Sequence, residues 1–341
     1  MRSAPPIVRD LPLLAVAVVW GSSFLVVKQL ATPQTVLPVL VLRFALVLPL
    51  LGLFAFRALR GLTVREWLGG AALGGILGAI FLLETYGAVH TSATNAGLIV
   101  SLTMVLTPLA ESAVRRSAPS WSFLGAAGLS VLGVALLTGG GFQTPGTGDL
   151  LVLGAALVRT VHVLTMSRTR AIAATDSLAL TWVQLAAAGV VFTGASLFAG
   201  PSALAVAAGF GPVQWAYLLH LSLLCTLFAF FVQMWAVRAT SPSRVSLLLG
   251  TEPLWAAAFG TTLGGDRLAP LALLGGALVL VGTEWGRRAG TGGGPRPASG
   301  GEAVADRTPA GGRDDEALTG AQSPAAVAHA GGVDRQPDGA R

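Results

Sequence analysis

The chain is a succession of apolar runs, each about 20 residues long, separated by short breaks of turn-forming or charged residues. A helix of about 20 apolar residues crosses the roughly 30 Å hydrocarbon core of a bilayer. The breaks carry turn signals such as Gly200-Pro201 and Ser241-Pro242. The pattern therefore predicts an all-α integral membrane protein with ten transmembrane helices, at residues 10–30, 36–57, 66–87, 92–114, 121–138, 149–169, 177–199, 213–237, 243–264 and 268–286.

The two ends of the chain do not follow this pattern. Residues 289–341 are mainly Gly, Pro, Ala, Asp and Arg, and they have almost no large apolar side chains to offset the entropy of ordering. We expect residues 289–341 to be a disordered cytoplasmic tail and residues 1–9 a short cytoplasmic N-terminus. The first apolar run is too long for a signal peptide and another run follows at once, so we expect it to remain as a helix.

Composition agrees with a membrane protein and excludes two other classes. Hydrophobic residues make up 53% of the chain and charged residues only 11%, whereas soluble domains carry about 25% charged residues. The sequence pI near 10.8 does not indicate a nucleic-acid partner, because the arginines lie singly or in small groups beside apolar runs and form no basic stripe. The single cysteine, Cys225, excludes an internal disulfide and a cysteine metal cluster.

The distribution of basic residues predicts the orientation in the membrane. With the N-terminus in the cytoplasm, thirteen arginines fall at inside loops and helix ends, and only Lys28 and Arg267 fall outside. Cytoplasmic loops carry such an excess of Lys and Arg, so both termini are expected in the cytoplasm. Heavy use of Arg, Ala and Gly indicates a GC-rich genome, and we expect the plasma membrane of a bacterium.

An internal repeat divides the ten predicted helices into two halves. The fourth and ninth runs align without a gap at an offset of 149 residues, so that residues 92–96 face residues 241–245. Five is an odd number, and the second half must therefore insert upside down relative to the first. We expect one five-helix repeat over residues 10–138 and a second over residues 149–288, with a substrate site near the midplane between them.

Short motifs spaced along the apolar runs resemble those of a known transporter family. They are Trp20-Gly21-Ser22-Ser23-Phe24, Leu42-Arg43-Phe44, Thr91-Ser92-Ala93-Thr94-Asn95-Ala96, Ser241-Pro242-Ser243 and Glu252-Pro253. On these motifs the chain resembles an EamA-type permease of the drug/metabolite transporter superfamily over residues 10–288. The resemblance implies two inverted five-helix repeats that move amino acids, other metabolites or toxic organic compounds, usually outward. Met104 departs from the family pattern, because the first repeat often has proline there.

Ionisable groups inside the apolar runs are the candidates for function, because each is expensive at membrane depth and must face a cavity or a partner. Glu252, in the ninth run beside Pro253, is the first choice for a substrate or proton pathway. Burial favours the protonated form of a carboxyl group, which suits proton coupling. The alternative is a structural ion pair of Glu252 with Arg159 or Arg43.

Four further ionisable residues are candidates for the same pathway. Arg159 and His162 share one face of the sixth run; they could bind an anionic substrate or move a proton, or they could neutralise a glutamate and satisfy a carbonyl. Arg43 is either a structural partner or a substrate anchor. Glu84 either forms a gate-like ion pair with Lys28 on the outer side or reaches interfacial water.

Two other features concern the shape of the helices. Trp20 lies at mid-depth in the first run and could wall a cavity or pack between helices. Gly70, Gly74 and Gly78 recur every four residues in the third run, which predicts a close helix–helix contact.

The sequence thus predicts a secondary active transporter, in the export direction, for small organic metabolites, amino acids or drugs, working by alternating access with proton coupling. A passive facilitator or channel is the alternative, and a membrane enzyme a more distant one. No phosphate-binding loop, H-E-x-x-H motif or Cys/His metal spacing is present, so no cofactor, metal or enzymatic activity is expected. The expected partners are the lipid bilayer, a small-molecule substrate and protons, and a second copy of the chain is a further candidate.

Overall fold

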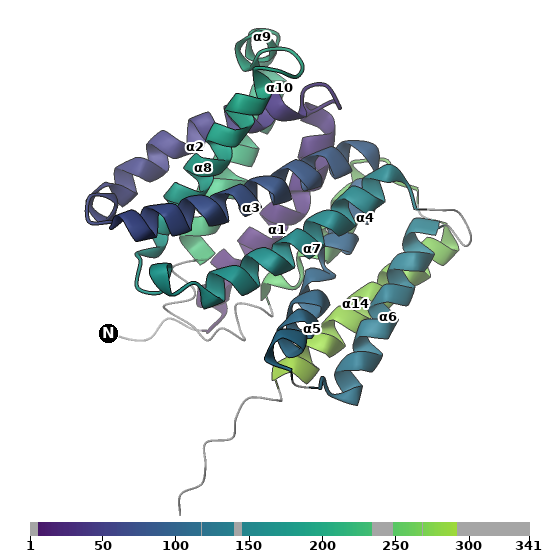
Figure 1. Cartoon of the computed structure of the whole chain (residues 1–341). Coiled ribbons are helices and arrows are strands. Elements are labelled where there is room, and N and C mark those ends of the chain that lie inside the picture. Colours follow the sequence, from purple (N-terminus) through teal and green to yellow (C-terminus); the bar gives the residue numbers. More distant parts are fainter. Residues whose placement is uncertain (1–5, 117, 140–144, 234–247, 268, 292–341) are drawn as a thin grey trace, which may run out of the picture. The chain divides into compact units, whose positions relative to one another are not determined.

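Helices account for the regular structure in the computed structural model, which describes residues 6–116, 118–139, 145–233, 248–267 and 269–291. The first half contains six helices (Figure 1). They are α1 (Pro6–Leu30), α2 (Val36–Leu59), α3 (Val64–His90), α4 (Ala93–Val100), α5 (Thr103–Arg115) and α6 (Trp121–Gly139).

The second half repeats the alternation of long helices and short connections. Its elements are α7 (Thr147–Arg168), the 3₁₀ turn η1 (Arg170–Ile172), α8 (Ser177–Ser196), α9 (Ala203–Ala208), α10 (Pro212–Leu219), the π-helix η2 (His220–Phe228), α13 (Glu252–Thr262) and α14 (Pro270–Thr291). The predicted tail, residues 289–341, lies outside the described residues beyond Thr291.

Among the described residues, seven helical segments are long and apolar enough to cross a membrane. They correspond to the predicted runs one to four and six to eight, and they span Leu11–Leu30, Val36–Leu59, Val64–His90, Ala93–Val114, Thr147–Arg168, Ser177–Ser196 and Pro212–Gln233. The fifth and tenth runs are shorter apolar helices, Trp121–Leu136 and Pro270–Gly286. Part of the ninth run, residues 243–247, lies outside the described residues, and the described part forms the 11-residue helix α13.

Side-chain caps explain where several helices begin. Thr63 and Glu66 form a reciprocal capping box at α3, with the Thr63 N–H donating to Glu66 Oε2 at 2.8 Å. The Ser92 hydroxyl accepts from the Asn95 N–H at α4, and Asp176 accepts from two N–H groups at α8. These polar residues satisfy N–H groups that have no partner within the helix.

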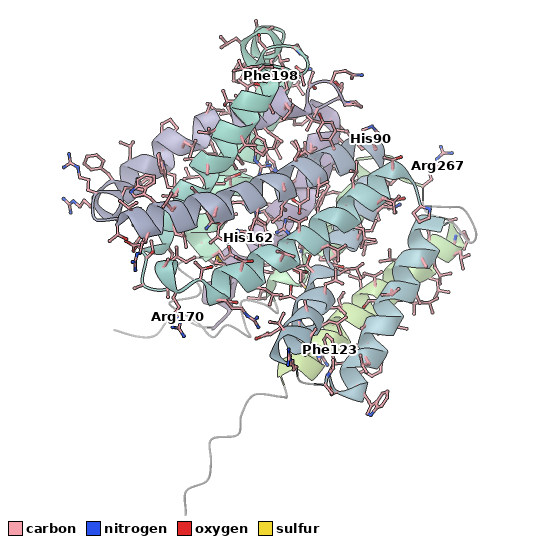
Figure 2. All side chains as sticks on the ribbon, viewed as in Figure 1. His90, Phe123, His162, Arg170, Phe198 and Arg267 are labelled. Atoms are coloured by element: carbon pink, nitrogen blue, oxygen red, sulfur yellow. The ribbon has the colours of Figure 1, made fainter. Side chains whose placement is uncertain are left out.

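The main apolar core joins the two halves. Phe44 on α2 contacts Phe81 on α3 and Phe192 on α8, with ring centroids 5.1 and 5.5 Å apart. All three helices pack on one another, and α3 also packs along α7. Figure 2 shows Arg170 and Phe198, which flank α8 in the chain, at opposite edges of the structure, with His162 of α7 in the interior between them.

Small residues let α3 and α8 approach closely. A Cβ atom added at Gly74 would lie 2.5 Å from the Gln184 carbonyl oxygen and 2.7 Å from Ala187 Cβ. A Cβ at Gly70 would lie 2.8 Å from Val183, and one at Gly78 would lie 3.3 Å from Ala188. The glycines singled out in the sequence therefore face α8 and set the distance between the two helices.

Large apolar side chains also cover much of the outside. Leu53 and Phe54 on α2 are 76% and 61% exposed, and Val190 on α8 is 72% exposed. Soluble monomers rarely expose apolar surface on this scale, whereas lipid is an apolar solvent for it. The exterior therefore fits a protein embedded in a membrane.

Candidate functional site

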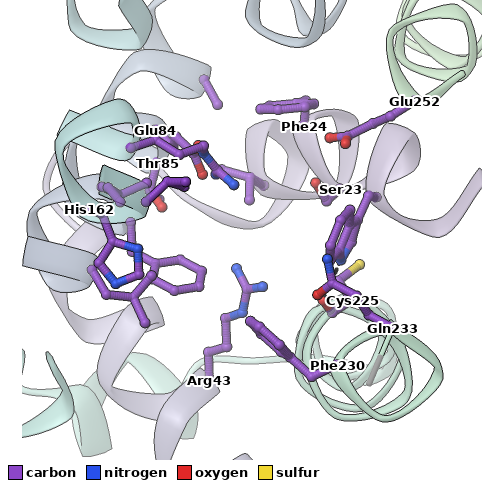
Figure 3. A pocket seen from close by; sticks show the side chains of 18 residues that line it. Ser23, Phe24, Arg43, Glu84, Thr85, His162, Cys225, Phe230, Gln233 and Glu252 are labelled. Atoms are coloured by element: carbon purple, nitrogen blue, oxygen red, sulfur yellow. Dashed lines mark hydrogen bonds and ion pairs between the residues drawn. The ribbon is translucent and has the colours of Figure 1, made fainter. Parts of the chain in front are cut away.

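A cavity of about 280 Å³ lies between helices of both halves. The first half contributes residues of α1, α2 and α3, and the second half contributes residues of α7, of η2 and the helical residues 229–233 after it, and of α13. Figure 3 shows polar and charged side chains converging on this space. Its polar lining consists of Trp20, Ser23, Arg43, Glu84, Thr85, Arg159, His162, Cys225, Gln233 and Glu252.

Arg159 on α7 and Glu84 on α3 form an ion pair in the wall of the cavity, with Nη2 of Arg159 donating to Oε1 of Glu84. The Glu84 side chain is 15% exposed and the Arg159 side chain 38%. Of the two alternatives for Glu84, an outer ion pair with Lys28 or contact with interfacial water, the structure does not form the first, because Glu84 is paired with Arg159. Lys28 instead lies 3.9 Å from Asp266, because α3 presents Glu84 toward α7 rather than toward the end of α1.

Glu252 occupies the first position of α13 and Pro253 the second. In this first turn a backbone N–H would have no partner within the helix, so proline, which lacks one, is tolerated. Its carboxyl group lines the cavity. The alternative of a structural pair between Glu252 and Arg159 or Arg43 is not what the structure shows, because Arg159 pairs with Glu84 and Arg43 binds a hydroxyl group. Among the described residues, Glu252 has no hydrogen-bond or ion-pair partner, so its carboxyl group is available to a ligand or a proton.

Arg43 is buried in α2, and its partners are neutral. Nε and Nη2 of Arg43 donate to Oγ1 of Thr226 at 3.1 and 2.9 Å. The guanidinium also lies over the Phe81 ring, 5.0 Å from its centroid. Hydrogen bonds to a hydroxyl and contact with an aromatic face fix the position of the charge without cancelling it.

His162 and Trp20 complete the polar wall through hydrogen bonds between helices. Nε2 of His162 donates to Oε1 of Gln184 at 2.7 Å, which links α7 to α8. Nε1 of Trp20 donates to the Cys225 carbonyl oxygen at 2.8 Å, which links α1 to η2. Both side chains line the cavity while one ring nitrogen of each holds a neighbouring helix.

A second polar cluster lies at the N-terminus of α4. Oδ2 of Asp266 accepts from both the N–H and the hydroxyl of Thr94, at 3.0 and 2.9 Å. Oδ1 of Asp149 accepts from the Thr91 hydroxyl at 2.5 Å and from Nδ2 of Asn95 at 3.3 Å. Two carboxylates of the second half therefore hold the start of α4, a helix of the first half.

Sequence reasoning missed Thr226, Gln184 and Asp149. Each is a common polar residue within or beside an apolar run, and each gains its role from a residue far away in the chain. A single sequence carries little signal for such contacts. The one usable sign for Asp149 is its position three residues after Gly146, where a carboxylate can accept from the backbone N–H of Gly146.

Comparisons with known proteins identify the fold and the family. A model described as the EamA-like transporter family matches residues 10–139 and 146–284. A protein of Archaeoglobus fulgidus named uncharacterized transporter is 27% identical over 281 residues, which cover 80% of this chain and 83% of that protein. A second uncharacterized transporter of this organism is 27% identical over 273 residues, covering 77% of this chain and 92% of the relative.

A solved crystal structure shares the fold. It superposes with a TM-score of 0.53 at 17% sequence identity, over 82% of this chain and 96% of that chain. Identity this low is evidence for the fold alone.

The family match and the apolar helices agree on a membrane transporter. The match extends over most of the chain in two consecutive segments, and it confirms the resemblance first seen in the short motifs around Trp20, Arg43 and Glu252. The protein therefore belongs to the EamA-like transporter family.

Proposed function

We propose that the protein is a secondary active exporter that moves a small organic molecule through the cavity by alternating access. The observation that carries the proposal is the lining of the cavity, which combines Arg43, Glu84 and Trp20 of the first half with Arg159, His162 and Glu252 of the second. A site built from both halves changes its access when the halves rock against each other.

Three structural features define what the cavity accepts. Its volume of about 280 Å³ suits a molecule the size of an amino acid or a small drug. Trp20, Phe24, Phe81 and Phe230 supply aromatic walls for an apolar portion of the ligand. Arg43 and Glu252 have no ion-pair partner among the described residues, so they can bind the polar ends of a ligand. The substrate class is therefore a small organic metabolite, amino acid or drug with at least one ionised group.

The proposal includes the arrangement in the membrane. Ten transmembrane helices form two inverted repeats, residues 10–138 and 149–288, with both termini in the cytoplasm of a bacterial cell. The excess of arginine at one side of the predicted helices and the two segments matched by the family model support this topology. Residues 289–341 form a cytoplasmic tail in this arrangement.

Protons are the proposed coupling ion, with Glu252 as the group that carries them. A carboxyl group without an ion-pair partner can lose a proton on one side of the membrane and regain it on the other. Because the proton and the substrate bind in the same cavity, the binding of one changes the affinity for the other.

Reconstitution into proteoliposomes tests the proposal. The purified protein is screened with a panel of radiolabelled amino acids and cationic and anionic organic compounds, with and without an imposed pH gradient. We expect at least one compound to accumulate against its concentration gradient only when the pH gradient is present. Equal flux under both conditions would indicate a passive facilitator, and no flux with any compound would contradict transport through this cavity.

Export is tested separately in cells. A strain that lacks the protein is grown on the same panel and compared with a strain that overproduces it. Export predicts that overproduction raises tolerance to the transported compound and lowers its cellular content. Higher cellular content on overproduction would show import instead.

A further inference from the structure

The eighth apolar run contains a π-helix, η2, directly beside the cavity. A π-helix closes its hydrogen bonds five residues apart instead of four, is rare, and is frequent at functional sites. The Thr226 side chain follows the same spacing, because its hydroxyl donates to the carbonyl oxygen of Leu221 at 2.9 Å. With its proton used in this way, Oγ1 of Thr226 presents its lone pairs to Arg43.

Arg43 uses two of its three guanidinium nitrogens on this one oxygen atom. Thr226 is fully buried and Arg43 is only 7% exposed, so this contact is shielded from water. Figure 3 shows the guanidinium reaching from α2 into the cavity. The remaining N–H donors of the fork are therefore offered to the cavity.

The two arginines of the cavity differ in their partners. Arg159 is neutralised by the Glu84 carboxylate, whereas Arg43 has no ion-pair partner among the residues that the structure describes. A buried guanidinium without a counter-ion is unfavourable, and the usual remedy is a carboxylate. At this position the chain supplies a neutral hydroxyl instead, which leaves the positive charge for a ligand.

We propose that Thr226 is a positioning residue that holds Arg43 without neutralising it, so that Arg43 receives a carboxylate or another anionic group of the transported molecule. The proposal rests on the proposed function, in that it takes the cavity as the transport site. It adds which group binds the anionic end of the substrate and which residue keeps that group in place.

The only cysteine of the chain provides a test that requires no known substrate. Cys225 lines the same cavity and precedes Thr226 in the chain. The protein in lipid nanodiscs is treated with two methanethiosulfonate reagents of similar size, the anionic sulfonatoethyl and the cationic trimethylammonium-ethyl compound. The ratio of the two reaction rates reports the electrostatic potential at Cys225, because a change in access affects both reagents alike.

Thr226→Val removes the hydroxyl and keeps the shape, and Thr226→Ser is the matched control that keeps the hydroxyl. Without its neutral acceptor, the Arg43 guanidinium is expected to turn toward the carboxylates of the cavity. The anionic-to-cationic ratio should then fall about tenfold in Thr226→Val, toward the value of Arg43→Gln, and remain near the wild-type value in Thr226→Ser. Equal ratios in the wild type and Thr226→Val would overturn the role of Thr226, and an unchanged ratio in Arg43→Gln would overturn the anion site.

A second reporter thiol is used in case Cys225 reacts slowly. Ser23, on α1, also lines the cavity, and Ser23→Cys in a Cys225→Ala background carries the same measurement. In proteoliposomes, Thr226→Val should raise the KM of a carboxylate-bearing substrate while Thr226→Ser restores it. A wild-type protein that transports nothing, but whose thiol ratios follow the prediction, would contradict the proposed function and the binding of a transported anion, and would leave only the positioning of Arg43 by Thr226 intact.

Discussion

Glu252 and Glu84 are two carboxylates of one cavity with different surroundings. Glu84 is paired with Arg159, whereas Glu252 begins α13 and has no ion-pair partner among the described residues. Under the proposed proton coupling, Glu252 is the carboxyl group of the cavity without an ion-pair partner among the described residues. The division of roles between the two glutamates follows from the single contact that Arg159 makes.

Replacement of Glu252 by Gln is expected to abolish coupling while preserving the shape of the cavity. Gln cannot ionise, so accumulation driven by a pH gradient should fall at least ~10-fold, whereas exchange of substrate at equal pH should persist. Uptake and counterflow in proteoliposomes measure the two quantities. Glu252→Asp is the control and should retain a response to the gradient. An undiminished response in the Gln variant would show that Glu252 does not carry the proton.

The Arg159–Glu84 pair is expected to contribute to stability. Glu84→Gln and Arg159→Gln each leave one partly buried group without its partner, and each should destabilise by about 1–3 kcal/mol, a range reduced for partial exposure. The double variant should lose less than the sum of the two. Thermal unfolding in detergent measures the shifts. Glu284→Gln, in an exposed pair with Arg288, is the control and should change little. Additive losses would contradict a direct interaction.

The cavity residues could be proposed from the sequence, but their pairing could not. An ionised side chain within an apolar run must avoid lipid, so Arg43, Arg159 and Glu252 were recognisable by type and depth. Their partners depend on the rotation of each helix and on which helices are neighbours. That is why the sequence leaves the partner of Glu84 open between Lys28 and interfacial water, and why the uncharged Thr226 gives no signal at all.

At the scale of elements, the contact between α3 and α8 depends on the absence of side chains at one face of α3. Gly74 belongs to this face, and a Cβ atom there would meet the backbone of α8 at 2.5 Å. The adjacent Gly75 faces away, with no atom within 4 Å of the position of its Cβ. The two neighbours form a matched pair for experiment.

Gly74→Ala is expected to destabilise the protein by about 1–3 kcal/mol, because α8 must move to admit the methyl group. Gly75→Ala should be neutral or slightly stabilising, since alanine is the better helix former. Thermal unfolding of both variants in the same detergent makes the comparison. Similar melting temperatures for the two would show that α3 and α8 separate easily at this point.

The start of α4 is held by carboxylates from the other half of the chain. Asp266 accepts the Thr94 N–H, which would otherwise lack a partner in the first turn. Asp266→Ala should accelerate amide hydrogen exchange of this turn by roughly tenfold to a hundredfold, the effect of losing a hydrogen bond to a charged acceptor. Mass spectrometry of peptides from α4 gives the rate. Asp266→Asn keeps an acceptor oxygen and should show a smaller effect; unchanged exchange in the Ala variant would contradict the contact.

The positions of the long helices followed from the apolar runs, but two departures could not be foreseen. The fourth run breaks into α4 and α5 around Ser101 and Leu102, although it contains no glycine or proline at the break. The eighth run contains the π-helix η2, and residues of η2 accept hydrogen bonds from Trp20 and Arg43. The fifth and tenth runs form α6 and α14 close to their predicted bounds, and these two helices pack along each other. Tertiary contacts, not local propensity, decide such details.

At the scale of the whole molecule, the family could be recognised from the order and spacing of short motifs, and the family model confirms it. The substrate could not be recognised. Cavity residues from six elements meet only after folding, and small changes among them alter what is bound.

Inverted insertion of the two halves predicts which loops face which side. Single cysteines are placed at Gln34, Gly61, Ala174 and Gly209 in a Cys225→Ala background. A membrane-impermeant maleimide applied to intact cells should label Gln34→Cys and Gly209→Cys, which lie in predicted outer loops. It should label Gly61→Cys and Ala174→Cys only after the membrane is opened. Labelling of all four positions from one side would contradict the inverted arrangement.

Lys28, which pairs with Asp266, is the only lysine in the chain, and this has a practical consequence. Besides the terminal amine, every acylating label, amine crosslinker or lysine-specific protease finds a single target in this protein. That target lies at the end of α1 and faces a carboxylate from beyond α13. A crosslinker with one amine-reactive arm therefore attaches at Nζ of Lys28. Its crosslinked products identify the groups that come close to Lys28 during transport.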